Sequence, residues 1–142
     1  DYELFGTMNI NYLKLDEIPD YEDGWRPVVD ALANGEFFVT TGEVLITDFS
    51  VEGVESGETV NGNESAELIA DLEWTYPLSY MEIISGDGAT IYRDRINLSH
   101  TTEFDSETIN RNVDLSNRSW VRIEVWDIAR NGAFTQPVWI EN

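Results

Sequence analysis

From residue 36 onward, apolar and polar residues alternate in short runs that are separated by turn-forming residues. Residues 66–76 show the alternation best, because carboxylates at Glu67, Asp71 and Glu73 fall between apolar positions. Side chains of a strand point alternately to opposite faces, so this run predicts a strand with one buried face. The predicted inward set is Ala66, Leu68, Ala70, Leu72, Trp74 and Tyr76.

Runs of this kind recur along the whole C-terminal part. Strands are predicted near 37–41, 44–53, 66–76, 79–85, 89–96, 107–114, 119–127 and 133–141. The Asp-Gly pair within 85–90 predicts a tight hairpin, and the stretch 55–64 is predicted to be a loop. This spacing is typical of a mainly β fold, an antiparallel β-sandwich of the immunoglobulin-like type with one short N-terminal helix.

The N-terminal part has a different pattern. Residues 8–15 alternate as a strand does, and residues 16–24 form a predicted acidic loop. A helix over 24–34 follows, with Asp23 as N-cap, Pro27 in the first turn and Gly35 at the C-terminus. One face is apolar at helical spacing and is expected to pack on the sandwich. It consists of Trp25, Val28, Val29 and Leu32.

The last two predicted strands carry three of the five tryptophans. Val121, Ile123 and Val125 form the better core set, so the opposite face of 119–127 is predicted to point outward. In the last strand, Phe134, Val138 and Ile140 are predicted to point inward. The outward set is Trp120, Arg122, Glu124, Trp126 and Trp139.

Three interpretations of these outward tryptophans stay open. They are covered by the helix, the N-terminal strand or a neighbouring domain, because a clustered apolar surface is usually covered. Alternatively, they form a stacking platform for sugar rings. In the third interpretation, a bulge within 127–132 reverses the face assignment.

The charge is strongly negative, with 28 acidic and 8 basic residues and a formal net charge of −20. Nucleic acid and anionic membrane surfaces would be repelled over about 8–10 Å, so neither is expected as a partner. Such acidity favours a periplasmic or extracellular bacterial setting. The absence of cysteine excludes disulfides and thiol chemistry within the chain. Because the sequence begins with Asp1, we expect a processed protein or a piece of a longer one.

No convincing active site is predicted. His100 is the only histidine and is expected to be a surface strand residue, since a transition-metal site normally needs several imidazole or thiolate ligands. A cluster of carboxylates offers a weak calcium candidate without the spacing of an EF-hand loop, so a solvated loop is preferred. The cluster is Asp16, Asp20, Glu22 and Asp23.

Two stretches together resemble a known family. GWRPVVDALANGEFFVTTGEVLI (24–46) is similar to the helix-to-strand segment near the end of PHP-superfamily metallohydrolases of the CehA/McbA-like group. WVRIEVWDIARNGAFTQPVWIEN (120–142) is similar to the closing strands of the β-sandwich that follows their catalytic domain. Glu43 departs from the pattern, since relatives often have proline there.

The resemblance implies that residues 1–43 are the tail of a missing catalytic domain and that 44–142 are an accessory β-sandwich domain. The parent would be a metal-dependent phosphoesterase or esterase that holds its divalent metal in the N-terminal domain. This chain itself would be non-catalytic, without a cofactor, and would pack against that domain of the same polypeptide. The alternative is a free-standing carbohydrate-binding module that uses the exposed tryptophans.

Overall fold

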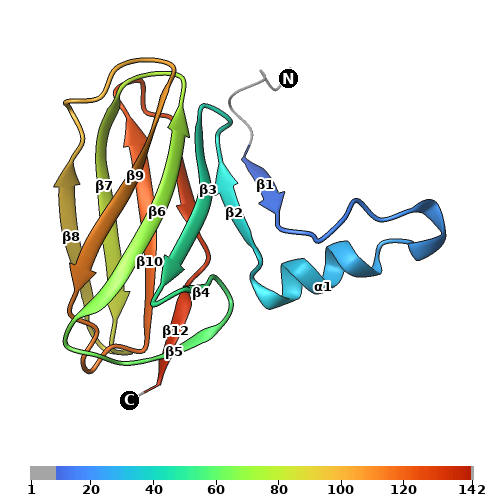
Figure 1. Ribbon diagram of the computed structural model, residues 1–142, viewed down its shortest axis with the longest axis horizontal. Helices are drawn as coiled ribbons and strands as arrows, with labels where there is room; N and C mark the ends of the chain where they lie inside the picture. The colour runs from blue at the N-terminus through green and yellow to red at the C-terminus, as the bar shows by residue number, and fades with distance from the viewer. Residues whose placement is uncertain (1–8, 142) are drawn as a thin grey trace.

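The computed structural model describes residues 9–141, without the side chain of Asp23. Within this range the chain forms two β-sheets packed face to face, and a helical arm extends from one side of them (Figure 1). The predicted β-sandwich is therefore confirmed. The elements in chain order are β1 (Ile10–Leu13), the 3₁₀ helix η1 (Tyr21–Asp23), α1 (Arg26–Asn34), β2 (Phe37–Thr40), β3 (Val44–Val51), β4 (Val54–Glu55), β5 (Thr59–Asn61), β6 (Ala66–Trp74), β7 (Leu78–Gly86), β8 (Ile91–Asn97), β9 (Asp105–Val113), β10 (Trp120–Asp127), β11 (Gly132–Thr135) and β12 (Val138–Glu141).

The larger sheet is centred on β10. Strand β7 pairs with one side of β10 and carries β8 at its outer edge, whereas β11 and β12 share the other side of β10. Strands β2 and β1 extend the sheet beyond β11, and β5 lies parallel to β12. The smaller sheet has the order β4-β3-β6-β9.

The order in which the chain visits the two sheets is the one found in immunoglobulin sandwiches. Strands β3, β6 and β9 take the places of A, B and E, and β7, β8, β10 and β12 take those of C, C′, F and G. Strand β2 adds to the larger sheet of this arrangement, because it pairs with β11 through Val39 and Phe134.

The core lies between the sheets and follows the predicted alternation. In β6, the inward residues from Ala66 to Trp74 are all buried, and the side chains between them face outward. Tyr76 belongs to the predicted inward set, but it is 46% exposed because β6 ends at Trp74. The Trp74 indole Nε1 donates a hydrogen bond of 2.6 Å to the carbonyl oxygen of Thr102.

The last predicted strand is divided in two. The chain breaks after Thr135, and Val138 then pairs with Val121 at the other end of β10. Proline has no N–H to donate to a strand ladder, which places the break at Pro137. Phe134, predicted to point inward, is 37% exposed, whereas Val138 and Ile140 are buried as expected.

The segment 55–64, predicted to be a loop, contains β5 and the end of β4. Strand β5 forms because Thr59 to Asn61 pair in parallel with β12. The two paired segments are far apart in the sequence. The Gly and Asn residues around β5 are typical of loops, so the local sequence does not predict this strand. The hairpin predicted within 85–90 is confirmed, with Gly88 at φ +90° between β7 and β8.

Candidate functional site

Residues 14–35, here called the arm, extend sideways from the sandwich and contain η1 and α1 (Figure 1). The helix begins later than predicted, because Trp25 is its N-cap and makes no side-chain capping bond. Asp23 is therefore not the N-cap. Pro27 lies at the start of the helix, and Gly35 closes it in the left-handed conformation at φ +79°, both as predicted.

The predicted apolar stripe of α1 is largely exposed and is not packed on the sandwich. Trp25 is 79% exposed, Val29 is 57% exposed and Leu32 is 39% exposed, while Val28 is partly buried. The opposite side of the helix, with Pro27 and the buried Ala31, faces the rest of the arm. The structure thus corrects the expectation that the stripe packs on this chain's own sandwich.

The arm is held at the C-terminal end of its helix. A Cβ on Gly57 would lie 1.9 Å from the carbonyl oxygen of Asn34, so the backbone of the 56–58 loop touches the end of α1. The Gly57 N–H in turn donates to the Pro137 carbonyl oxygen at 2.8 Å. Lys14 Nζ donates to the Glu55 carboxylate, and this hydrogen bond raises the pKa of Lys14.

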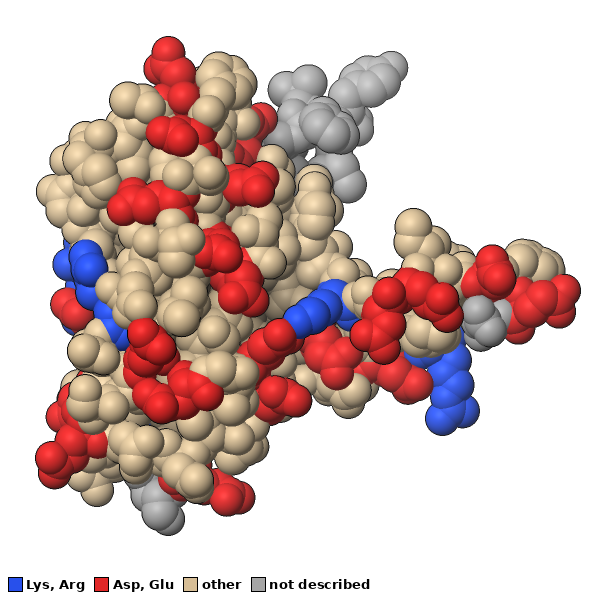
Figure 2. All heavy atoms as spheres, viewed as in Figure 1, with Lys and Arg blue, Asp and Glu red and all other residues tan. Residues whose placement is uncertain are grey.

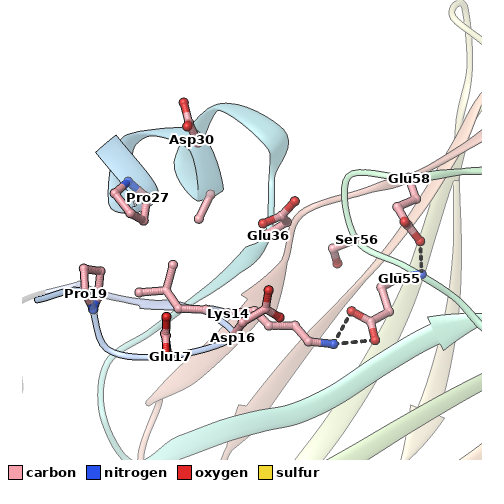
Figure 3. A pocket seen from close by; sticks show the side chains of 12 residues that line it. Lys14, Asp16, Glu17, Pro19, Pro27, Asp30, Glu36, Glu55, Ser56 and Glu58 are labelled. Atoms are coloured by element: carbon pink, nitrogen blue, oxygen red, sulfur yellow. Dashed lines mark hydrogen bonds and ion pairs between the residues drawn. The ribbon is translucent and has the colours of Figure 1, made fainter. Parts of the chain in front are cut away.

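A hollow of about 550 Å³ lies between the arm and the sandwich (Figure 3). Its walls are acidic, and Lys14 is its basic residue. The carboxylates that line it are Asp16, Glu17, Asp30, Glu36, Glu55 and Glu58. Among the described residues, however, no three His, Cys, Asp or Glu side chains gather as a group that could hold a metal ion.

The calcium candidate is not assembled by the residues that the structure describes. Asp16 lines the hollow, whereas Asp20 and Glu22 are exposed farther along the arm, and the Asp23 side chain lies outside the description. Glu43 lines a separate shallow hollow with Glu73 and Asp105.

His100 lies in the turn that follows β8 rather than in a strand, and it is at the surface as expected. Its Nε2 is 3.1 Å from Glu107 Oε2.

The outer face of β10 carries the predicted residues. Val121, Ile123 and Val125 are fully buried in the core, and the residues between them are partly exposed on the opposite face. Trp139 is 48% exposed and pairs directly with Trp120, so both lie on this outer face. The face assignment made from the alternation is therefore confirmed.

Two of the three tryptophans lie on glycines. Trp120 pairs with Gly86 of β7, and Trp126 pairs with Gly132 of β11. A methyl group on either glycine would come within 2.7 Å of the facing indole ring. Aromatic side chains stabilise glycine-containing strands in this way. Trp120 and Trp126 thus have a structural explanation, which Trp139 lacks.

A network of ion pairs crosses the same face. Glu82 of β7 is 6% exposed and accepts hydrogen bonds from Arg95 Nη2 at 2.7 Å and from Arg93 Nη1 at 2.6 Å. The hydrogen bond from Arg95, followed by the one from Arg93, lowers the pKa of Glu82. On β10, Arg122 Nη2 donates to Glu124 Oε1 at 2.6 Å.

A groove of about 400 Å³ runs beside this network. The guanidinium of Arg122 lies 5.6 Å from the ring centre of Phe134 in its wall. Trp126 does not line the groove, so the five outward residues do not form one site. The lining residues are Trp120, Arg122, Glu124, Phe134, Thr135, Gln136, Pro137 and Trp139.

Glu82, Gln136 and Pro137 were not among the candidate site residues predicted from the sequence. The alternation of Arg93 and Arg95 in β8 is a usable signal, because it places two of only 8 basic residues on one face. Carboxylates, by contrast, are spread over the visible surface of the sandwich and over the arm (Figure 2). Because carboxylates are so abundant, a carboxylate in the sequence does not by itself indicate a functional position.

In comparisons with known proteins, no family model, no curated protein and no solved structure matches this chain. The resemblance to PHP-superfamily metallohydrolases therefore stays a hypothesis. None of the helices in the described residues has the length and apolar character to cross a membrane.

Proposed function

We propose that this chain is the non-catalytic accessory β-sandwich of a PHP-type metal-dependent hydrolase. In this proposal the sandwich docks on the catalytic domain of the same polypeptide through the outward face of α1. The arm is the docking element, and the sandwich is the rigid body that positions it.

The observation that carries the proposal is the direction of the apolar stripe. Trp25, Val29 and Leu32 lie on the side of α1 opposite Pro27 and Ala31, which face the arm itself. A helix of nine residues is marginal in water without packing on an apolar face. Burial of such side chains stabilises by about 1.5–3 kcal/mol each, so a partner that covers the stripe would gain substantially.

The sequence of the arm also supports the identity of the partner. Residues 24–46, which resemble the end of the catalytic domain in that family, span α1 and β2 and reach into β3. The proposed partner would therefore lie on the N-terminal side of the chain and reach α1 directly.

The proposal is tested by binding. We expect the reading frame before residue 1 to encode a histidine-rich catalytic domain, and that domain, expressed separately, to bind this chain in calorimetric titrations. The double substitution Trp25→Ala with Leu32→Asp should weaken binding by about tenfold or more. Ile91→Ala is the matched control, because Ile91 is 63% exposed on β8, away from the arm.

Two results would contradict the proposal. One is a start codon immediately before residue 1. The other is turnover by the isolated chain of generic ester or phosphoester substrates with Mn²⁺, Zn²⁺ or Fe²⁺, if a chelator abolishes that turnover. We expect no such turnover, because the proposal assigns the metal ligands to the catalytic domain.

A further inference from the structure

We infer that the groove on the outer face of β10 and β12 binds a neutral saccharide. This inference is independent of the proposed docking, since the groove is lined by residues 120–139 and includes none of the arm. A volume of about 400 Å³ is within the usual range for small-molecule sites.

The walls of the groove provide the apolar surface that a sugar ring needs. Trp139 and Phe134 are 48% and 37% exposed, and each belongs to a paired strand of the larger sheet. Trp120 is fixed beside them by its contact with Gly86. Rigid aromatic rings offer a large contact area at little entropic cost, and the C–H face of a pyranose stacks on such rings.

The polar floor supplies donors and acceptors side by side. The side chains of Arg122 and Glu124 are 25% and 19% exposed and are joined at 2.6 Å, so both are held in place before a ligand arrives. A guanidinium only donates, and a carboxylate only accepts. A sugar hydroxyl does both, so neighbouring hydroxyls of one ring are matched by this pair.

The same pair disfavours two other occupants. A proline-rich peptide also stacks on aromatic grooves, but proline has no N–H to donate to Glu124. An acidic saccharide would place its carboxylate near Glu124 in a protein of net charge −20. Both features favour a neutral saccharide.

The test is a calorimetric and fluorescence titration of the whole chain with cellohexaose, xylohexaose and mannohexaose. We expect at least one to bind saturably, with Kd roughly between micromolar and millimolar. Trp139→Ala should weaken that binding about tenfold or more, and Glu124→Gln should weaken it while the stacking surface stays intact. Phe104→Ala is the matched control, because the aromatic side chain of Phe104 is 80% exposed and does not line the groove, so this change should leave affinity unchanged.

Thermal unfolding of each variant shows whether it is folded. If Trp139→Ala does not fold, the affinity of Glu124→Gln for the saccharides tests the inference instead. Absence of binding by all three neutral hexaoses would overturn the inference. Binding that Trp139→Ala and Glu124→Gln leave unchanged would also overturn it. A preference for a galacturonate oligomer or a proline-rich decapeptide would overturn the assigned ligand class.

Discussion

Single residues decide how the outer face of the larger sheet is built. Glycine at positions 86 and 132 leaves room for the indoles of Trp120 and Trp126 to lie across the neighbouring backbone. Glu82 has a comparable local role, because it joins Arg93 and Arg95 of the next strand. Both features depend on cross-strand pairs, which contribute about 0.2–1 kcal/mol each to sheet stability.

Gly86→Ala is expected to destabilise the fold by about 1–3 kcal/mol through overpacking, because its methyl group would come within 2.7 Å of the Trp120 indole. A double-mutant cycle with Trp120→Ala, measured by urea unfolding, checks the cause. With the indole removed, the same methyl group should cost much less. Equal costs in both backgrounds would show that the glycine backbone, rather than the contact, matters.

Glu82→Gln is expected to change how the free energy of unfolding depends on pH in the acid range. The pKa of Glu82 is lowered from its ordinary value of 4.5, chiefly by the hydrogen bond from Arg95, so the folded state binds this proton more weakly than the unfolded state. The stabilising contribution is therefore fully present above pH 4.5 and is lost as the pH falls through that value toward the lower pKa of the folded protein.

The measurement is the free energy of unfolding of wild type and Glu82→Gln between pH 7 and pH 3. The difference between them should be constant at neutral pH and should shrink in acid. Glu73→Gln, at an exposed position of β6, is the control for general charge effects. A wild-type advantage that grows in acid would contradict a lowered pKa of Glu82 in the folded state.

At the scale of elements, the arm depends on one close contact. The end of α1 rests on the backbone of Gly57, where a Cβ would lie 1.9 Å from the Asn34 carbonyl oxygen. Gly57→Ala should therefore displace the helix. Hydrogen exchange of the α1 amides, and chymotrypsin cleavage after the exposed Trp25, should both become faster.

Gly53→Ala is the matched control for this displacement. Gly53 has φ +74° and Gly57 has φ +89°, so both substitutions place alanine in a left-handed conformation that costs about 1–2 kcal/mol. Only at Gly57 does the methyl group meet another segment, since nothing lies within 4 Å at Gly53. Equal acceleration of exchange in α1 by both variants would show that the contact does not position the arm.

The sequence predicted the elements whose burial is one-sided. Alternation located β6 and the faces of β10, because each has one face in the core. It misplaced Phe134, since hydrophobicity suggested the core while the register opposite Glu124 turns it outward. The stripe of α1 is recognisable in the sequence, but its direction depends on the contact with the 56–58 loop, which no local pattern contains. The groove likewise depends on strand pairing, and Gln136 and Pro137 carry no distinct signal.

At the scale of the whole molecule, the dominant property is charge. The 28 acidic residues exceed the 8 basic ones more than threefold, and carboxylates are spread over the visible face of the sandwich and the arm (Figure 2). Three of the basic residues, Arg93, Arg95 and Arg122, are already engaged in ion pairs on the larger sheet. The acidic residues therefore outnumber the basic residues that could neutralise them, and repulsion among the carboxylates destabilises the compact state.

Added salt is expected to stabilise the protein. The Debye length falls from about 30 Å at 0.01 M to about 10 Å at 0.1 M ionic strength, so repulsion between exposed carboxylates is screened more than the partly buried pairs of Glu82. The thermal midpoint should therefore rise from roughly 0.01 M to 0.3 M NaCl, most steeply at the low end. KCl should give the same curve, because screening depends on ionic strength and not on the cation. A midpoint that fell with salt would show that the ion pairs on the larger sheet outweigh the repulsion, and different curves for the two salts would indicate specific cation binding by the carboxylates.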